Sequence, residues 1–146
     1  MKKIVFFLGL LLFPTLVFAS SNDLIEEKYR SRLSDIVQGT YKQCNRDRFA
    51  MNESGYYPVD VLLGTGRSSH YGNKLLRQVV EKSLYTFSLH EKSKQLLIAE
   101  YIYEELSEQY GVDFLKFDGT IWKHVSEEDS VDRVMKSFQI MLKTRY

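Results

Sequence analysis

The stretch DVLLGTGRSSHYGN, residues 60–73, joins a short apolar run to a helical pattern through a loop rich in glycine. Glycine adopts backbone conformations with positive φ at no steric cost, so this loop can form a tight connection between a strand and a helix. Backbone N–H groups at the start of a helix can also bind an anion. The loop is therefore either a structural connection, which we favour, or the site of a small anion or another ligand.

The two interpretations of the loop assign different roles to its residues. The spacing of the glycines matches neither the dinucleotide-binding fingerprint nor the phosphate loop that ends in Gly-Lys-Ser/Thr. As a connection, the loop would use Asn73 to cap a helix beginning at Lys74, and Gly72 to turn the chain sharply before it. As a ligand site, the loop would use Gly64, Gly66, Arg67, His70, Gly72 and Asn73.

Apolar residues recur at steps of three and four on both sides of the loop, which is the pattern of amphipathic helices. Two helices are predicted after it, over residues 74–87 and 94–110, and Gly111 should end the second. A third is predicted upstream, with Asp23 and Glu26 as a capping pair and an end near Cys44. A fourth should follow Ser126, which resembles a helix cap with Asp129, and should expose Arg133, Lys136 and Lys143.

A β-hairpin is predicted between residues 114 and 125, because Asp118-Gly119 separates two apolar runs. A two-residue turn there would pair Phe117 with Thr120, Leu115 with Trp122, and Asp113 with His124. Leu115, Phe117 and Trp122 would then share one face of the hairpin, which we expect to be its structural core face.

The order of these elements predicts an α+β fold. It consists of a short strand, two helices, a β-hairpin and a last helix, which is a winged-helix-like order, with an amphipathic helix before it. The predicted domain organisation is a signal peptide over residues 1–19, the N-terminal helix and a linker over 20–59, and the domain itself over 60–146.

The first residues, MKKIVFFLGLLLFPTLVFASS, have the three parts of a secretory signal peptide: Lys2 and Lys3, an apolar run, and small residues around Ala19. The apolar run is short for a membrane-spanning helix, and Pro14 interrupts it. We expect an exported protein, periplasmic or secreted, that begins at Ser20 and has no membrane segment in its mature form. Without Lys2 and Lys3 the chain keeps 18 of its 20 basic side chains against 19 acidic ones, a formal charge of −1.

The single cysteine, Cys44, excludes an internal disulfide. Two interpretations stay open for it. One is a partly buried apolar residue near a helix end, and the other is a disulfide between two copies of the chain in an oxidising compartment.

The segment from residue 60 to about 145 resembles the family called domain of unknown function 6824, which is abundant in diatoms and related protists. Members typically read DVLxGRG, then HPGN, FRxLV, a glycine before FL, and a tryptophan followed by a valine. The family's loop arginine is Thr65 here, with Arg67 just beyond, its proline is Tyr71, and its phenylalanine is Leu76. The resemblance implies a fold unit and no activity. The matching residues are Asp60, Val61, Leu62, Gly64, Gly66, His70, Gly72, Asn73, Arg77, Ala99, Phe114, Leu115, Trp122 and Val125.

The sequence bears on three classes of function. Nucleic-acid binding is disfavoured because the helix that a winged-helix domain would insert into DNA carries Glu100, Glu104, Glu105 and Glu108. Catalysis is disfavoured because the histidines lack metal-ligand spacing and GRSSHYG is not a serine-hydrolase motif. A ligand-binding enzyme that uses the glycine loop stays the alternative. A non-catalytic interaction module, with an unknown protein or small-anion partner and with no metal or cofactor, is the favoured prediction.

Overall fold

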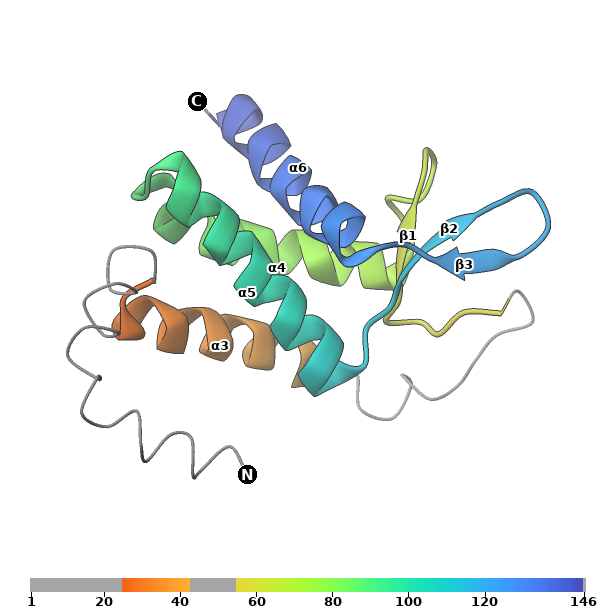
Figure 1. Ribbon diagram of the computed structural model, residues 1–146, viewed down its shortest axis with the longest axis horizontal. Helices are drawn as coiled ribbons and strands as arrows, with labels where there is room; N and C mark the ends of the chain where they lie inside the picture. The colour runs from red at the N-terminus through yellow and green to blue at the C-terminus, as the bar shows by residue number, and fades with distance from the viewer. Residues whose placement is uncertain (1–24, 43–54, 146) are drawn as a thin grey trace, which may run out of the picture.

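The computed structural model describes residues 25–42 and 55–145 of the chain. Within these segments, four helices pack together and a three-stranded sheet lies at one end of them (Figure 1). The prediction of a small α+β domain preceded by a helix is confirmed. The elements in chain order are α3 (Glu27–Tyr41), β1 (Val61–Leu63), α4 (Tyr71–Ser88), α5 (Lys92–Tyr110), β2 (Phe114–Phe117), β3 (Trp122–His124) and α6 (Glu127–Arg145).

The sheet has the order β1-β2-β3. β1 pairs in parallel with β2, and β2 pairs antiparallel with β3. A parallel pair needs a long crossover connection, which α4 and α5 supply. The parallel pairing brings the start of β1 beside the start of β2 and the connection that follows α5, and the β2–β3 hairpin extends away from the helices (Figure 1).

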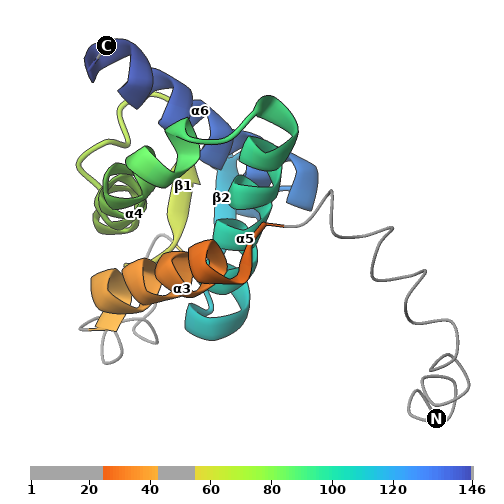
Figure 2. The same ribbon diagram turned by 90° about the vertical axis from the view of Figure 1, so that its left-hand side faces the viewer.

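The core lies between the helices and one face of the sheet. At its centre Phe87 of α4 stacks on Phe138 of α6, with 4.0 Å between the ring centroids. α3 contributes Leu33, Val37 and Tyr41, all fully buried, and it bridges α4 and α5 (Figure 2). Burial of such side chains gives about 1.5–3 kcal/mol each, so α3 is part of the same hydrophobic core as the helices that follow.

Several predicted helix ends are confirmed. Gly111 ends α5 in the left-handed conformation, with φ of 62°, and the N–H of Val112 donates to the Leu106 carbonyl at 3.0 Å. Ser126 precedes α6, and its hydroxyl oxygen accepts a hydrogen bond from the Asp129 N–H at 3.1 Å. Ser126 therefore caps α6 as predicted from its spacing to Asp129.

Three predictions about the helices need correction or lie outside the described residues. α3 begins at Glu27, and Glu26 occupies the N-cap position. The Glu26 side chain makes no capping hydrogen bond, so the predicted role of Glu26 in a capping pair is not found. Asp23 and Cys44 lie outside the described residues. Arg133 is half-buried rather than solvated, because α6 packs this side against α4.

The predicted register of the hairpin is wrong. Phe117 pairs with Trp122 and Leu115 with His124, so four residues rather than two form the turn. The carboxylate of Asp118 accepts hydrogen bonds from the N–H groups of Thr120 and Ile121, both at 2.8 Å, and this stabilises the longer turn.

The predicted core face of the hairpin is also corrected. Leu115, Phe117 and Trp122 do share a face, because residues two apart point the same way along a strand. Leu115 is 4% exposed, but Phe117 is 42% exposed and Trp122 is only half-buried. Phe114, on the opposite face, enters the main core instead.

Among the described residues, no helix is both long and apolar enough to cross a membrane.

Candidate functional site

The glycine loop between β1 and α4 has two residues that need glycine for their conformation. Gly64 has φ of 115° and Gly66 has φ of 75°, a region that side chains with a Cβ rarely adopt. Within the described part of the chain, no atom outside the adjacent residues lies within 4 Å of where a Cβ would stand at either position. The two glycines therefore shape the loop through backbone freedom and not through close contact.

Asn73 does not cap α4, because the helix begins at Tyr71 with His70 as its N-cap. Asn73 is buried inside the first turn, and its side-chain amide contacts β1. Its Oδ1 accepts a hydrogen bond from the Leu62 N–H, and its Nδ2 donates to the Leu62 carbonyl, both at 2.8 Å. These two groups of Leu62 lie on the edge of β1 that has no partner strand among residues 25–42 and 55–145. The amide thus covers a free sheet edge.

Gly72 does not turn the chain through a positive φ as expected. It allows α4 to approach the segment before β1 closely. A Cβ at this position would lie 2.0 Å from the carbonyl oxygen of Asp60 and 2.5 Å from that of Val59. Any other residue would push the helix away from the start of the strand.

Asp60 is a buried carboxylate that the sequence did not single out beyond its place in the family pattern. Its Oδ2 accepts from the Tyr57 N–H at 2.8 Å, and its Oδ1 accepts from the Asp113 N–H at 3.0 Å. It thus links the segment before β1 to the α5–β2 connection. Burial raises the pKa of Asp60, and the two backbone hydrogen bonds oppose that rise.

The His70 side chain connects the end of the glycine loop to the backbone of Asp60. Its Nε2 lies 2.8 Å from the Asp60 carbonyl oxygen, so the ring donates a hydrogen bond from this nitrogen. Burial lowers the pKa of His70, and the nearby Arg67 charge lowers it further, while the bond to Asp60 acts in the opposite direction. The neutral ring is favoured in this place.

Arg67 lies over the ring of Trp122, with 4.9 Å from Cζ to the ring centroid. Its Nε is buried and has no hydrogen-bond partner among the described residues. The ring of Tyr56 contacts both His70 and Trp122 edge-on, at 5.1 and 5.5 Å between centroids. The loop residues Arg67 and His70 therefore meet aromatic rings from two other segments, and Tyr56 was missed because no sequence periodicity includes it.

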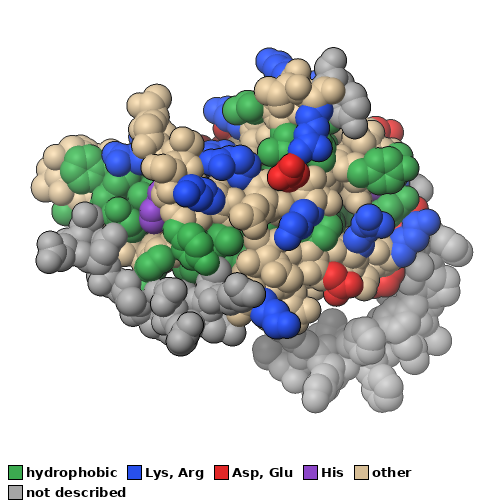
Figure 3. Space-filling model, turned by 180° about the vertical axis from the view of Figure 1, so that it is seen from behind, with side chains coloured by type: hydrophobic (Ala, Val, Ile, Leu, Met, Phe, Trp, Pro, Cys, Tyr) green, Lys and Arg blue, Asp and Glu red, His purple; other side chains and the backbone are tan. Residues whose placement is uncertain are grey.

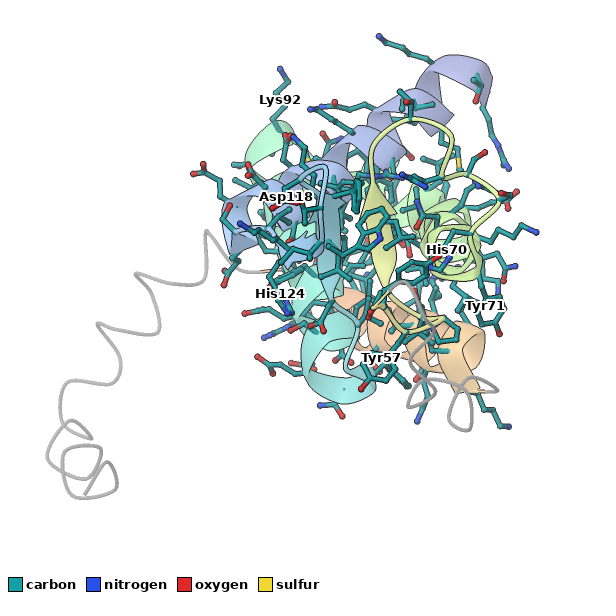
Figure 4. All side chains as sticks on the ribbon, turned by 90° about the vertical axis from the view of Figure 1, so that its right-hand side faces the viewer. Tyr57, His70, Tyr71, Lys92, Asp118 and His124 are labelled. Carbon is teal, nitrogen blue, oxygen red and sulfur yellow. The ribbon has the colours of Figure 1, made fainter. Side chains whose placement is uncertain are left out.

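The histidines do not converge. Figure 4 labels His70 beside the first turn of α4 and His124 across the sheet from it. The His124 ring lies 3.8 Å from the Asp113 carboxylate, as expected from the sequence despite the changed register. The His124 side chain is largely exposed, and that of Asp113 is partly exposed. His90 Nδ1 bonds the Thr86 carbonyl at 2.7 Å. No group of three potential metal ligands occurs among residues 25–42 and 55–145.

Four of the six predicted loop residues contact other parts of the protein, whereas Gly64 and Gly66 only shape the loop. Gly72, His70 and Asn73 contact backbone groups of residues 59–62, and Arg67 contacts Trp122. A side chain of α4 also fixes the backbone of the loop, because Arg77 Nη2 donates a hydrogen bond to the Ser68 carbonyl at 2.7 Å. The contacts of these groups are those of a structural connection.

A second candidate site is a groove of about 450 Å³ between α5 and α6. Its floor is apolar, with Leu96 45% exposed, Val131 buried and Met135 half-buried. Carboxylates stand around this floor. Its lining residues are Leu96, Glu100, Glu127, Glu128, Val131, Asp132, Met135 and Gln139.

The electrostatic character of this groove is acidic. Asp132 is paired with Lys136 at 3.0 Å, but Glu100, Glu127 and Glu128 have no ion pair in the part of the chain that the structure describes. Burial raises the pKa of the adjacent Glu104, and the charges of Glu108, Glu127 and Glu100 raise it further. A cation in the groove would relieve this repulsion.

The family model described as "Domain of unknown function (DUF6824)" matches residues 60–139, which is more than half of the chain. This chain belongs to the DUF6824 family. The DUF6824 segment begins at Asp60, contains the whole loop and the hairpin, and ends within α6. Both walls of the groove lie inside it, whereas α3 precedes it. No curated protein and no solved structure matches the chain.

Proposed function

We propose that this protein is exported and that its DUF6824 domain is a non-catalytic interaction module. In this proposal the module binds a cationic, amphipathic segment of a partner protein in the groove between α5 and α6. The observation that carries it is that Leu96, which is exposed, and Met135, which is half-buried, lie beside three carboxylates with no ion pair among the described residues, Glu100, Glu127 and Glu128. Amphipathic helices bind such grooves through their apolar face.

The composition of the groove indicates the chemistry of the partner. Leu96 and Met135 offer apolar surface to large side chains, and methionine adapts its shape to different partners. The rim carboxylates attract Lys and Arg and repel acidic segments, which gives specificity and faster association. A helix with leucines on one face and lysines beside them satisfies both requirements.

The same carboxylates argue against a nucleic-acid partner. α5, the helix that would enter the major groove, carries Glu104 and Glu108 exposed to solvent and Glu100 on the rim. Phosphate groups would be repelled by this side of the domain. We therefore expect no tight, salt-dependent binding to duplex DNA in a gel-shift titration at low salt.

A fluorescent synthetic helix of leucine and lysine at helical spacing tests the groove. Fluorescence anisotropy should show binding that weakens by about tenfold in the Glu127→Gln/Glu128→Gln double variant and in Met135→Lys. Glu27→Gln on α3 is the matched control, because Glu27 is exposed and lies outside the groove, and it should leave binding unchanged. An acidic peptide of the same pattern should not bind. Equal binding to all variants, or no binding at low salt, would refute the proposal.

Export has its own test. The signal pattern of residues 1–19 predicts a mature chain that starts at Ser20, and these residues lie outside the described part of the structure. Intact mass spectrometry of the exported fraction should give the mass of residues 20–146. Recovery of the full-length mass from cells would contradict export with cleavage. That result would not affect the proposal that the α5–α6 groove binds a peptide.

A further inference from the structure

A pocket of about 130 Å³ lies between the first half of α4 and the middle of α6. It is separate from the acidic groove, which lies on the other side of α6. Seen from behind, the molecule shows mostly Lys and Arg on its charged surface and few Asp or Glu side chains (Figure 3). The pocket is lined by Asn73, Arg77, Arg133, Ser137, Ile140 and Met141.

Two guanidinium groups reach this pocket from different helices. Arg133 of α6 donates to the hydroxyl oxygen of Ser137, and Arg77 of α4 donates to the Ser68 carbonyl. Neither arginine has an ion pair among the described residues, whereas Arg145 further along α6 is paired with Glu81. An arginine has five N–H donors, so most of the donors on Arg77 and Arg133 are still available.

The two cations also disfavour each other. Arg133 is half-buried, and both its burial and the nearby charge of Arg77 lower its pKa. A partly buried cation beside a like charge is costly unless an anion accompanies it. Among the residues that the structure describes, no side-chain carboxylate lines the pocket to supply this charge.

We propose that Arg77, Arg133 and Ser137 bind a small tetrahedral oxyanion, such as phosphate, sulfate or a phosphate monoester, in the pocket between α4 and α6. Guanidinium groups bind phosphate through two parallel hydrogen bonds, and a doubly charged anion balances the two arginines. The volume is far above the roughly 10–15 Å³ that one water molecule needs, and it accommodates five heavy atoms.

Ser137 completes the geometry of the site. Its hydroxyl oxygen already accepts from Arg133 and donates to the Arg133 carbonyl at 3.0 Å. With an anion bound, the hydroxyl hydrogen can turn toward it while the oxygen keeps the bond from the guanidinium. Asn73 borders the pocket, but its amide is occupied by Leu62, so it does not contribute to binding.

Thermal melting of the full chain tests the site, with sodium phosphate, sulfate or acetate compared against sodium chloride at equal ionic strength. Phosphate and sulfate should raise the melting temperature by about 5 °C at about ten times Kd, and chloride should not. A shift with acetate as large as that with phosphate would overturn the assignment to a tetrahedral anion. Direct binding of inorganic phosphate is then measured by titration calorimetry.

Arg77→Gln and Arg133→Gln should each weaken phosphate binding at least tenfold. Arg77 is exposed, so its variant is expected to fold even if Arg133→Gln does not, and Arg133→Lys keeps the charge at the half-buried position. Arg67→Ala is the matched control and should bind phosphate normally. Loss of binding in Arg67→Ala with full binding in Arg77→Gln would overturn the proposal and place the anion at the glycine loop. The anion site does not depend on the proposed peptide groove, so a failure of peptide binding between α5 and α6 would not contradict phosphate binding by Arg77 and Arg133.

Discussion

The side-chain amide of Asn73 in α4 takes the place of a neighbouring strand for Leu62 in β1. It accepts from the Leu62 N–H and donates to the Leu62 carbonyl, both at 2.8 Å, while β1 pairs with β2 on its other edge. One side chain therefore completes the backbone hydrogen bonds of a buried strand and fixes the start of α4 against it.

Asn73→Ala should destabilise the protein by about 2–4 kcal/mol, because it leaves a buried donor and a buried acceptor unsatisfied. This exceeds the roughly 1 kcal/mol expected for the loss of a helix cap. Urea denaturation measures the free energy of unfolding, and hydrogen exchange should show faster exchange of the Leu62 amide. Thr65→Ala, an exposed change in the same loop, should stay within about 0.5 kcal/mol of the parent. A similarly small effect of Asn73→Ala would contradict the role of the amide.

Gly72→Ala should cost about 3 kcal/mol or more, because its Cβ would lie 2.0 Å from the Asp60 carbonyl oxygen and the helix must move. Gly39→Ala in α3 is the matched control, since nothing lies within 4 Å of its Cβ position. Alanine there should stabilise α3 by about 0.5–1 kcal/mol. Thermal and urea denaturation measure the stability of both variants. Equal stabilities of the Gly72→Ala and Gly39→Ala variants would show that α4 can shift away from β1 at no cost.

Asp60 and Asp118 should make opposite contributions to the pH dependence of stability. The pKa of Asp60 is raised in the folded state, so wild type should lose stability relative to Asp60→Asn as pH rises from the ordinary value near 3.8 through the folded pKa. Backbone hydrogen bonds from Ile121 and Thr120 lower the pKa of Asp118 to about 2. Wild type should therefore lose stability relative to Asp118→Asn as pH falls from about 4 to 2.

Urea denaturation between pH 2 and pH 6 measures these differences, and carboxyl NMR titration gives each pKa directly. A titration midpoint for Asp60 below that of an ordinary aspartate would mean that its two backbone hydrogen bonds outweigh its burial.

Trp122→Ala should cost about 1–2 kcal/mol, because the ring is half-buried and contacts Arg67, Phe117 and Tyr56 outside the main core. Phe138→Ala should cost about 3–5 kcal/mol, because Phe138 is fully buried and stacks on Phe87. The ranking in urea denaturation checks the corrected face of the hairpin, and a larger cost for Trp122→Ala would reverse that correction.

The helices were predictable from the sequence because their signals are local. Apolar periodicity places α4, α5 and α6, and Gly111 ends α5 where a positive φ is needed. Ser126 is likewise read from its distance to Asp129. Such signals depend on neighbours within one or two turns, which the sequence displays directly.

The hairpin and the loop were predicted less well because their geometry depends on distant or competing contacts. Asp118-Gly119 suggests a two-residue turn, but the Asp118 carboxylate binds two N–H groups and a longer turn forms. Asparagine is a common helix cap, so the sequence predicts a local hydrogen bond for Asn73. Its actual hydrogen-bond partner, Leu62, lies eleven positions earlier in the chain. The pocket lined by Arg77 and Arg133 needs α4 and α6 to pack, and no spacing within either helix reveals it.

The parallel pairing of β1 with β2 bears on the order of folding. Asp60 binds the backbone of Asp113, 53 positions later in the chain, and β1 has no strand partner until β2 is present. Closing so long a segment costs chain entropy before any ladder forms, and such high contact order slows folding. We expect α4 and α5 to associate first, and the glycine loop to reach its native shape only after the residues of β2 have emerged from the ribosome.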